Sequence, residues 1–173
     1  MADTSRARPS TISLIGMPGC GKSSVGVLLA KLGGLRFVDT DLDIQRLEGA
    51  TLQESLEARG YRYLREVEQR VLLEVSLADA VIATGGSAVY SAAGMARLVD
   101  AGAVVYLRTP LAVLRERVEG APPRGIASDP QQSYAEVYKE RTPLYERFAS
   151  VIVDCDDTGP GELAETILEK LSR

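Results

Sequence analysis

The chain has 173 residues, of which 45% are hydrophobic and 25% are charged, with 20 basic side chains against 24 acidic ones. This composition is typical of one globular domain, and the net charge of −4 argues against a surface that binds nucleic acid. The sequence has no histidine and two cysteines, which excludes Ser-His-Asp and Cys-His nucleophiles and any His-ligated or Cys-rich zinc site. Any proton transfer near neutral pH must therefore be carried out by Asp, Glu, Lys, Tyr or Cys.

The sequence also limits the partners and the location of the protein. No apolar run reaches the roughly 18 residues that a membrane-spanning helix needs. Residues 1–10 are polar and predict a flexible tail, without the apolar stretch of a signal peptide behind them. Two cysteines make no disulfide framework. We therefore expect a cytoplasmic protein that binds a small molecule, with no nucleic acid or membrane partner, and a monomer because no apolar interface stands out.

Short β-branched runs alternate with longer amphipathic stretches along the chain. Strands are predicted at 11–15, 35–38, 80–83, 103–107 and 151–153. Helices are predicted at 22–32, 43–47, 51–58, 61–78, 92–100, 110–119, 132–149 and 161–171. Pro143 should end or kink the helix 132–149, and residues 120–130, rich in proline and glycine, should form a mobile loop. The alternation predicts an α/β fold, one three-layer α/β/α domain over residues 11–173 with a five-stranded parallel sheet.

A glycine-rich phosphate-binding motif lies between the first strand and the first helix. Residues 16–23 read GMPGCGKS and fit G-x-x-x-x-G-K-[ST] at every fixed position. The glycines allow backbone N–H groups to converge on phosphate oxygens, and the helix dipole adds to their attraction. Lys22 is expected to reach the β- and γ-phosphates, and the Ser23 hydroxyl to bind Mg²⁺. The nucleotide should therefore contact Gly16, Gly19, Cys20, Gly21, Lys22, Ser23 and Ser24.

Two carboxylates follow the second strand, at the end where open parallel sheets bind ligands. Strand alternation sends Asp39 and Asp41 in the same direction, so that one could bind Mg²⁺ while the other orients the acceptor hydroxyl and takes its proton. The alternative is that Asp41 is the N-cap of the next helix, since Asp is a preferred capping residue. Spacing alone favours neither interpretation.

Further motifs follow in order: L-R-x-x-E at 64–68, Gly85-Gly86, Arg124 in the proline- and glycine-rich loop, and R-x-P-L-Y at 141–145. With the phosphate loop and the D-x-D at 39–41, this series resembles the shikimate kinases, members of the nucleoside-monophosphate-kinase-like group, over residues 12–171. The phosphate loop is common to many ATPases, whereas the combination is much more specific. The resemblance implies a P-loop kinase that uses ATP and Mg²⁺ to phosphorylate a hydroxyl of shikimate, in aromatic amino acid biosynthesis.

The resemblance also implies roles for single residues. Asp41 would bind the acceptor hydroxyls and act as the base, and Asp39 would hold Mg²⁺ through water beside Ser23. Lys22 and Arg124, which lies in a lid at about 120–130, would act on the transferred phosphate. The substrate would contact Asp41, Arg65, Gly85, Gly86, Ser87 and Arg141, and the adenine would lie against Arg117 and the loop around Pro160. Bidentate arginine pairing suits the carboxylate that Arg65 and Arg141 would clamp.

Each role has a plainer alternative. Arg65 could pair with Glu68 or Gln69 on an exposed helix face, and Arg117 could be a surface charge. Gly85-Gly86 could be only a turn after the strand. At the level of function, the alternatives are a related kinase for another hydroxy acid such as gluconate, and a nucleotide-binding module with little turnover.

The chain departs from the family pattern at two places. Ser87 stands where the family usually has a third glycine. If that position needs a positive φ, serine costs on the order of 1 kcal/mol, and otherwise its hydroxyl changes the substrate pocket. The lid reads RGIA at 124–127, where the family usually has proline and two aliphatic residues after the arginine, so we expect it to close less decisively.

Overall fold

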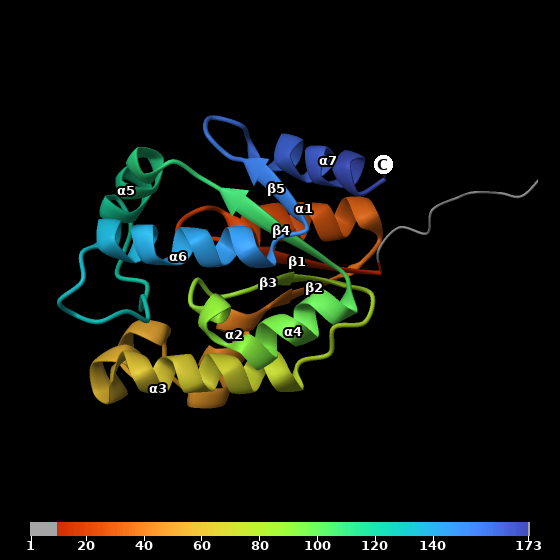
Figure 1. Ribbon diagram of the computed structural model, residues 1–173. Coiled ribbons are helices and arrows are strands. Elements are labelled where there is room, and N and C mark those ends of the chain that lie inside the picture. Colours follow the sequence, from red (N-terminus) through yellow and green to blue (C-terminus); the bar gives the residue numbers. More distant parts are fainter. Residues whose placement is uncertain (1–9, 173) are drawn as a thin grey trace, which may run out of the picture.

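A computed structural model describes residues 10–172, in which a parallel sheet lies between two layers of helices (Figure 1). Within these residues the sheet has five strands in the order β2-β3-β1-β4-β5, and every pair is parallel. The strands are β1 (Thr11–Ile15), β2 (Arg36–Asp39), β3 (Ala80–Ala83), β4 (Ala103–Arg108) and β5 (Val151–Asp154). The predicted α/β fold and its strands are confirmed to within one residue at each boundary. Residues 1–9 of the predicted tail lie outside the described residues.

The helices cover both faces of this sheet. They are α1 (Lys22–Gly33), α2 (Thr40–Glu48), α3 (Leu52–Glu74), α4 (Ala92–Ala101), α5 (Leu111–Glu119), α6 (Tyr134–Phe148) and α7 (Pro160–Leu171), with a short 3₁₀ helix η1 (Ala88–Tyr90). In Figure 1, α1 and α7 lie together on one side of the sheet, and α3 and α4 lie together on the other. Within residues 10–172, no helix combines the length and the apolar character needed to cross a bilayer.

Three predicted helix boundaries are wrong. The break predicted between 51–58 and 61–78 is confirmed by the non-helical backbone of Gly60 (φ 83°, ψ 169°), where α3 bends, but the second stretch ends at Glu74 and not at residue 78. The stretch 43–47 begins earlier, at Thr40, because the Asp39 side chain accepts a hydrogen bond from the backbone of the first turn. Pro143 does not end its helix, since α6 continues to Phe148. Burial of the neighbouring Arg141 and Tyr145 holds α6 in place despite the N–H group that proline lacks.

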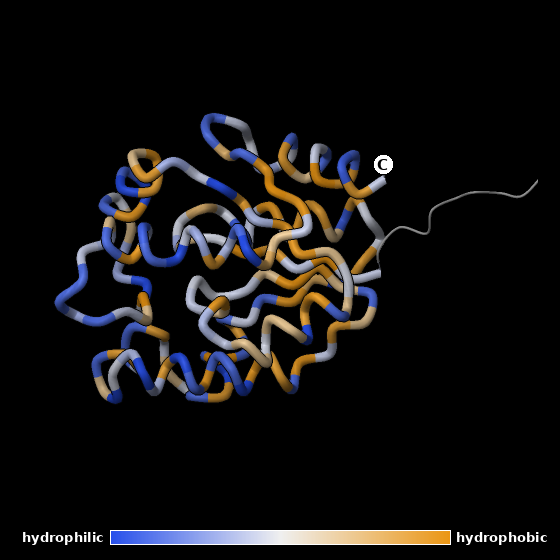
Figure 2. The backbone as a smooth tube through the Cα atoms, in the orientation of Figure 1, coloured by the Kyte–Doolittle hydropathy of each residue, from blue (hydrophilic) through white to orange (hydrophobic). Residues whose placement is uncertain are grey.

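The hydrophobic residues are concentrated in the sheet and on the helix faces turned toward it (Figure 2). β1 and β3 are buried along their whole length, as expected of central strands covered on both faces. A second, smaller cluster joins α2 and α3 to the loop before α6 and consists of Ile44, Leu64, Val67, Val71 and Ala127. The loop at 120–130 is therefore packed against α2 and α3 through Ala127.

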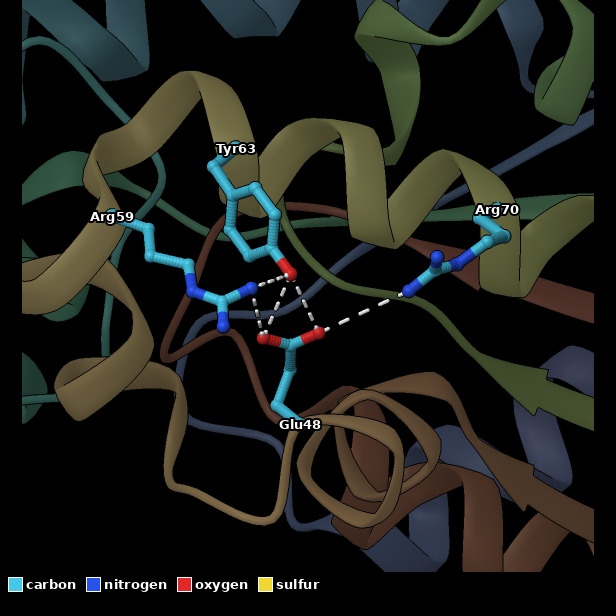
Figure 3. A network of polar contacts seen from close by, with 4 residues as sticks. All are labelled: Glu48, Arg59, Tyr63 and Arg70. Carbon is cyan, nitrogen blue, oxygen red and sulfur yellow. Dashed lines mark hydrogen bonds and ion pairs between the residues drawn. The ribbon is translucent and has the colours of Figure 1, made fainter.

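Polar contacts hold the end of α2 against α3 on both sides of the bend at Gly60 (Figure 3). Both carboxylate oxygens of Glu48 lie 3.0 Å from the Tyr63 hydroxyl. Glu48 also forms ion pairs with Arg59 at 3.7 Å and Arg70 at 3.9 Å. The arginines are half exposed, so each ion pair contributes less than ~1 kcal/mol, and the better-buried tyrosine contact does most to fix the two helices. The same helices carry Asp41 and Glu68 into the cavity described below.

Candidate active site

The phosphate loop leaves β1 and enters α1 through residues with positive φ. Gly19 (φ 88°) and Gly21 (φ 94°) adopt backbone conformations that other residues rarely accept. Gly21 is the N-cap of α1 and has no side chain to cap the helix, so the first N–H groups can face an anion. The ammonium of Lys22 donates to Gly16 O at 2.7 Å and to Met17 O at 3.0 Å. Lys22 is thus held at the loop by carbonyl groups.

Ser23 and Asp39 meet at one edge of this loop. The Ser23 hydroxyl donates to Oδ2 of Asp39 at 2.6 Å, and Oδ1 of Asp39 accepts from the backbone N–H of Asp41 at 3.0 Å. The N-cap of α2 is therefore Asp39, and the interpretation of Asp41 as the cap is wrong. A hydroxyl and a carboxylate fit Mg²⁺, which binds few protein oxygens and completes its shell with water and phosphates. No group of three or more His, Cys, Asp or Glu able to hold a metal occurs within residues 10–172.

A single cavity extends from the phosphate loop to the carboxyl ends of β2 and β3. Residues from the loop, from α2 and α3, from the segment after β3, from the loop before α6 and from α6 itself surround it. Its lining includes Gly19, Gly21, Lys22, Ser23, Ser24, Asp41, Glu68, Gly85, Gly86, Ser87, Arg124 and Arg141. The tertiary structure therefore brings together most of the residues that the sequence predicts for the two substrates.

Asp41 is a carboxyl group of the cavity with a raised pKa. Burial, and secondarily the negative charge of Asp39, raise the pKa of Asp41 to about 6, while Lys22 acts to lower it. A carboxylate with this pKa is deprotonated at neutral pH and still accepts a proton readily.

Gly85 and Gly86 are needed for space and not for a special backbone angle. A side chain at Gly85 would collide with Oε1 of Glu68 and would lie 3.0 Å from Oδ1 of Asp41. At Gly86, a Cβ would lie 2.7 Å from Pro18 and 2.9 Å from Nη1 of Arg141. The acidic and basic groups of the cavity thus approach the backbone closely, which a turn alone does not require.

Ser87 has φ −95° and ψ 3°, so the position does not need a positive φ and serine is not strained there. Its hydroxyl donates a hydrogen bond to Oε2 of Glu68, and both residues are buried. Sequence reasoning considered Glu68 only as a surface partner of Arg65 and missed it as a cavity residue. The available signal was its position on α3, next to the apolar face that Leu64 and Val67 form.

Arg65 and Arg141 both donate to the carbonyl oxygen of Ala127, at 2.9 and 2.8 Å. Arg141 is 1% exposed and lines the cavity, and its Nε has no hydrogen-bond partner within the described part of the chain. Arg65 lies outside the cavity lining, with its guanidinium 3.9 Å from the ring centre of Tyr90. Within residues 10–172 it forms no ion pair with Glu68, so the interpretation of Arg65 as a surface partner of that residue is wrong.

The loop at 120–130, called the lid below, contributes residues 124–127 to the cavity lining. Arg124 is exposed at its edge, and the N–H group of Gly125 donates to Oε1 of Gln53 at 2.9 Å. Gly125 has φ 65°, and a Cβ there would lie 2.5 Å from the backbone of Leu52. The RGIA sequence of the lid therefore packs closely against the start of α3.

Three predicted nucleotide contacts lie at the margin of the site. Arg117 is exposed and its Nη1 lies 3.4 Å from Gly19 O, at the loop itself. Pro160 is exposed at the first turn of α7 and is not part of the cavity lining. The side chain of Cys20 is buried in the hydrophobic core, which leaves its backbone as the group that could face a nucleotide.

Comparisons with known proteins agree with this geometry. A family model described as shikimate kinase matches residues 18–172. The chain belongs to the shikimate kinase family. The shikimate kinase of Nitrosospira multiformis is 34% identical to this chain over 170 residues, which is 96% of this chain and 87% of the relative. Shikimate kinase 2 of an Enterobacter species is 36% identical over 165 residues, 92% of this chain and 94% of the relative.

The structural comparison supports the same family. The shikimate kinase from Acinetobacter baumannii, solved in complex with shikimate, matches with a TM-score of 0.83 and 33% identity, over 96% of both chains. The resemblance predicted from the motifs is thus confirmed, as is the expectation of an enzyme of the kinase class. Two features of this chain lie at positions where the sequence departs from the expected motif, namely the contact between Ser87 and Glu68 and the hydrogen bond from Gly125 to Gln53.

Proposed function

We propose that the protein transfers the γ-phosphoryl group of ATP to a ring hydroxyl of shikimate, which yields shikimate 3-phosphate and ADP. The observation that carries this proposal is that Asp41, the phosphate loop and the buried Arg141 line one cavity. Membership of the shikimate kinase family supports the choice of acceptor. A protein that only bound ATP would have no use for a buried arginine and a carboxylate beyond the phosphate loop.

The acceptor carboxylate is bound by arginine in this proposal. Arg141 offers its unpartnered Nε, and it is nearly fully buried, where a charged hydrogen bond is strong. Arg65 completes the clamp when the carboxylate replaces Ala127 O as the acceptor of its hydrogen bond. Backbone groups of Gly85, Gly86 and Ser87 then lie against the ring.

The phosphoryl transfer is a direct displacement. Asp41 accepts the proton of the acceptor hydroxyl, whose oxygen forms a bond to the γ-phosphorus as the bond from that phosphorus to the β,γ-bridging oxygen breaks and ADP leaves with the electron pair. Lys22 exchanges the carbonyls of Gly16 and Met17 for phosphate oxygens, and Arg124 adds positive charge from the lid. Ser23 and, through water, Asp39 would hold Mg²⁺, which would neutralise part of the phosphate charge.

The remaining contacts concern the nucleotide base and the organisation of the chain. The adenine stacks on Arg117 beside the phosphate loop, and the segment around Pro160 covers its other side. Residues 11–173 form a single domain that acts as a monomer, and the lid moves to admit and release substrates. Sedimentation and hydrogen exchange with and without ATP and shikimate test these points: a dimer, or equal exchange in the lid in both states, would contradict them.

The decisive experiment is an ADP-release assay with a panel of hydroxy acids that includes shikimate, quinate and gluconate. Turnover on shikimate, with product phosphate located on the ring by NMR, supports the proposal. Turnover on gluconate alone would indicate a related kinase with a different acceptor, and ATP binding without any turnover would indicate a nucleotide-binding module. The Lys22→Met variant serves as the control for contaminating kinases.

A further inference from the structure

Glu68 is a cavity carboxylate with one oxygen bonded and the other free. It projects from α3, is 4% exposed, and accepts at Oε2 the hydrogen bond that the Ser87 hydroxyl donates. Its Oε1 is buried and has no hydrogen-bond partner within residues 10–172. Buried oxygens in folded proteins are nearly always paired, so this one points to a partner that the described chain does not supply.

The free oxygen lies beside Gly85, which lines the cavity together with Glu68 and Asp41. A Cβ added at Gly85 would collide with this Oε1 and would lie 3.0 Å from Oδ1 of Asp41. Glu68 and Asp41 therefore each present an oxygen to the same side of Gly85. No lysine or arginine within the described residues forms an ion pair with Glu68, so the missing partner is a donor that arrives with a ligand, such as a hydroxyl.

The backbone does not explain the serine at position 87. With φ −95° and ψ 3°, this position accepts alanine or glycine equally well. The side chain is 5% exposed, and its hydroxyl bonds to Oε2 of Glu68. That bond occupies one carboxylate oxygen and thereby orients the other toward Gly85.

We propose that Ser87 is a positioning residue, which holds Glu68 so that its free oxygen hydrogen-bonds a second ring hydroxyl of the acceptor, next to the hydroxyl that Asp41 binds. This inference rests on the proposed function, because shikimate carries several neighbouring ring hydroxyls. Ser87 and Glu68 together favour acceptors that carry several hydroxyl groups. They affect acceptor binding more than the transfer step.

Steady-state kinetics of the Ser87→Ala variant test this role. We expect the KM for shikimate to rise about tenfold, while kcat and the KM for ATP change less than about threefold, because the lost group orients a binding contact. Deoxy analogues of shikimate that each lack one ring hydroxyl locate the contact. For the analogue without the second hydroxyl, wild type and Ser87→Ala should have equal KM values. Unchanged KM for shikimate in the variant would overturn the proposal.

Ser91→Ala is the matched control for a merely structural effect. Ser91 is also buried near the start of α4, where its hydroxyl accepts from the N–H of Gly94 and donates to Gln69, outside the main cavity. This variant should lower the melting temperature and leave the KM for shikimate unchanged. If Ser91→Ala raised that KM as much as Ser87→Ala, the role of Ser87 would be structural and the proposal would fail.

A titration of Glu68 separates this inference from the proposed function, because it needs no substrate. Carbon-13 NMR of glutamate carboxyl groups, with Glu68 assigned through the Glu68→Gln variant, follows the proton directly. The groups that act on Glu68 besides Ser87 are Asp41 from α2, Arg141 from α6 and Lys22 from α1, and all are kept in Ser87→Ala. Loss of the hydroxyl should raise the pKa of Glu68 in the free enzyme. An unchanged titration would overturn the positioning role, whereas absence of turnover on shikimate by wild type would overturn the proposed function.

Discussion

Arg65 and Arg141 share one acceptor, the carbonyl oxygen of Ala127 in the lid, at 2.9 and 2.8 Å. The two guanidinium groups come from α3 and α6, and the lid carbonyl lies where they converge. A substrate carboxylate offers two charged oxygens in place of this single neutral one, so it is the better partner for both arginines. Under the proposed function, lid position and acceptor binding are therefore coupled through the same donors.

Replacement of Arg141 by alanine should weaken acceptor binding by about 2–4 kcal/mol, because a buried carboxylate would lose its charged partner. Calorimetric titration with shikimate measures this loss, and ATP affinity should change little. Arg141→Lys keeps the charge but not the bidentate geometry, and should recover only part of the affinity. Equal shikimate affinity of wild type and Arg141→Ala would remove this residue from the binding site.

Replacement of Asp41 by asparagine should lower kcat by at least ~100-fold while ATP affinity is kept, because the hydroxyl loses the group that takes its proton. Single-turnover phosphoryl transfer and nucleotide titration measure the two quantities. Wild-type turnover by Asp41→Asn would refute the role of this carboxylate.

The raised pKa of Asp41 predicts the acid limb of the activity. Because the base must be deprotonated, kcat/KM for the acceptor should fall as pH falls through about 6, the value to which burial and Asp39 raise the pKa of Asp41. This fall of kcat/KM at low pH should persist in Glu68→Gln, which removes the other carboxyl group with a raised pKa. It should be absent from the residual activity of Asp41→Asn. A limb lost in Glu68→Gln instead would assign it to Glu68.

The contact between Ser23 and Asp39 predicts how the activity depends on the Mg²⁺ concentration. Asp39→Asn removes a charge next to the Ser23 hydroxyl but keeps a side-chain oxygen that can cap α2, so stability should change little. The Mg²⁺ concentration for half-maximal activity should rise about tenfold, because the negative charge that holds the ion through water is lost. Thermal unfolding and a Mg²⁺ titration at fixed ATP separate the two effects, and an unchanged Mg²⁺ requirement would contradict the assignment.

Glu68 should make the protein less stable as pH rises. Burial raises the pKa of Glu68 to about 7 in the folded protein, against an ordinary value of 4.5. The folded state therefore holds this proton between about pH 4.5 and 7 while the unfolded chain releases it, and the free energy of unfolding falls across this window by up to about 3 kcal/mol. Glu68→Gln should flatten the profile in urea unfolding experiments. Glu54 provides a contrast of opposite sign, since its bonds to Thr51 lower its pKa and its stabilisation is lost as pH falls.

The conformation of Gly125 predicts that a side chain at this position would loosen the contact between the lid and α3. With φ 65° and the Leu52 backbone 2.5 Å from any Cβ, Gly125→Ala should loosen the lid from α3 and raise the KM for the acceptor severalfold. Faster hydrogen exchange of the lid measures the loosening. Gly120→Ala is the control at the other end of the lid, where φ is −82° and a Cβ has room, and it should leave exchange as in wild type.

Much of the fold and of the candidate site was available from local patterns. Apolar runs marked the central strands β1, β3 and β4 most clearly, because central parallel strands are buried on both faces. The phosphate loop and the carboxylates at the end of β2 were predicted from residue type and spacing, whereas the role of Arg141 came from the resemblance to a known family. These features depend on neighbours in sequence.

Contacts between distant segments decided the rest. Only the packing of α3 against the segment after β3 places Ser87 against Glu68, 19 positions away. Only the docking of the lid turns Arg65 toward Ala127, 62 positions away, and so out of the cavity lining. A serine or an arginine in isolation has several possible partners, and the tertiary fold selects among them by burial. The sequence by itself determined which chemical groups this protein has and at which end of the sheet they lie, whereas the tertiary structure decided which of them touch and which are left free for a substrate.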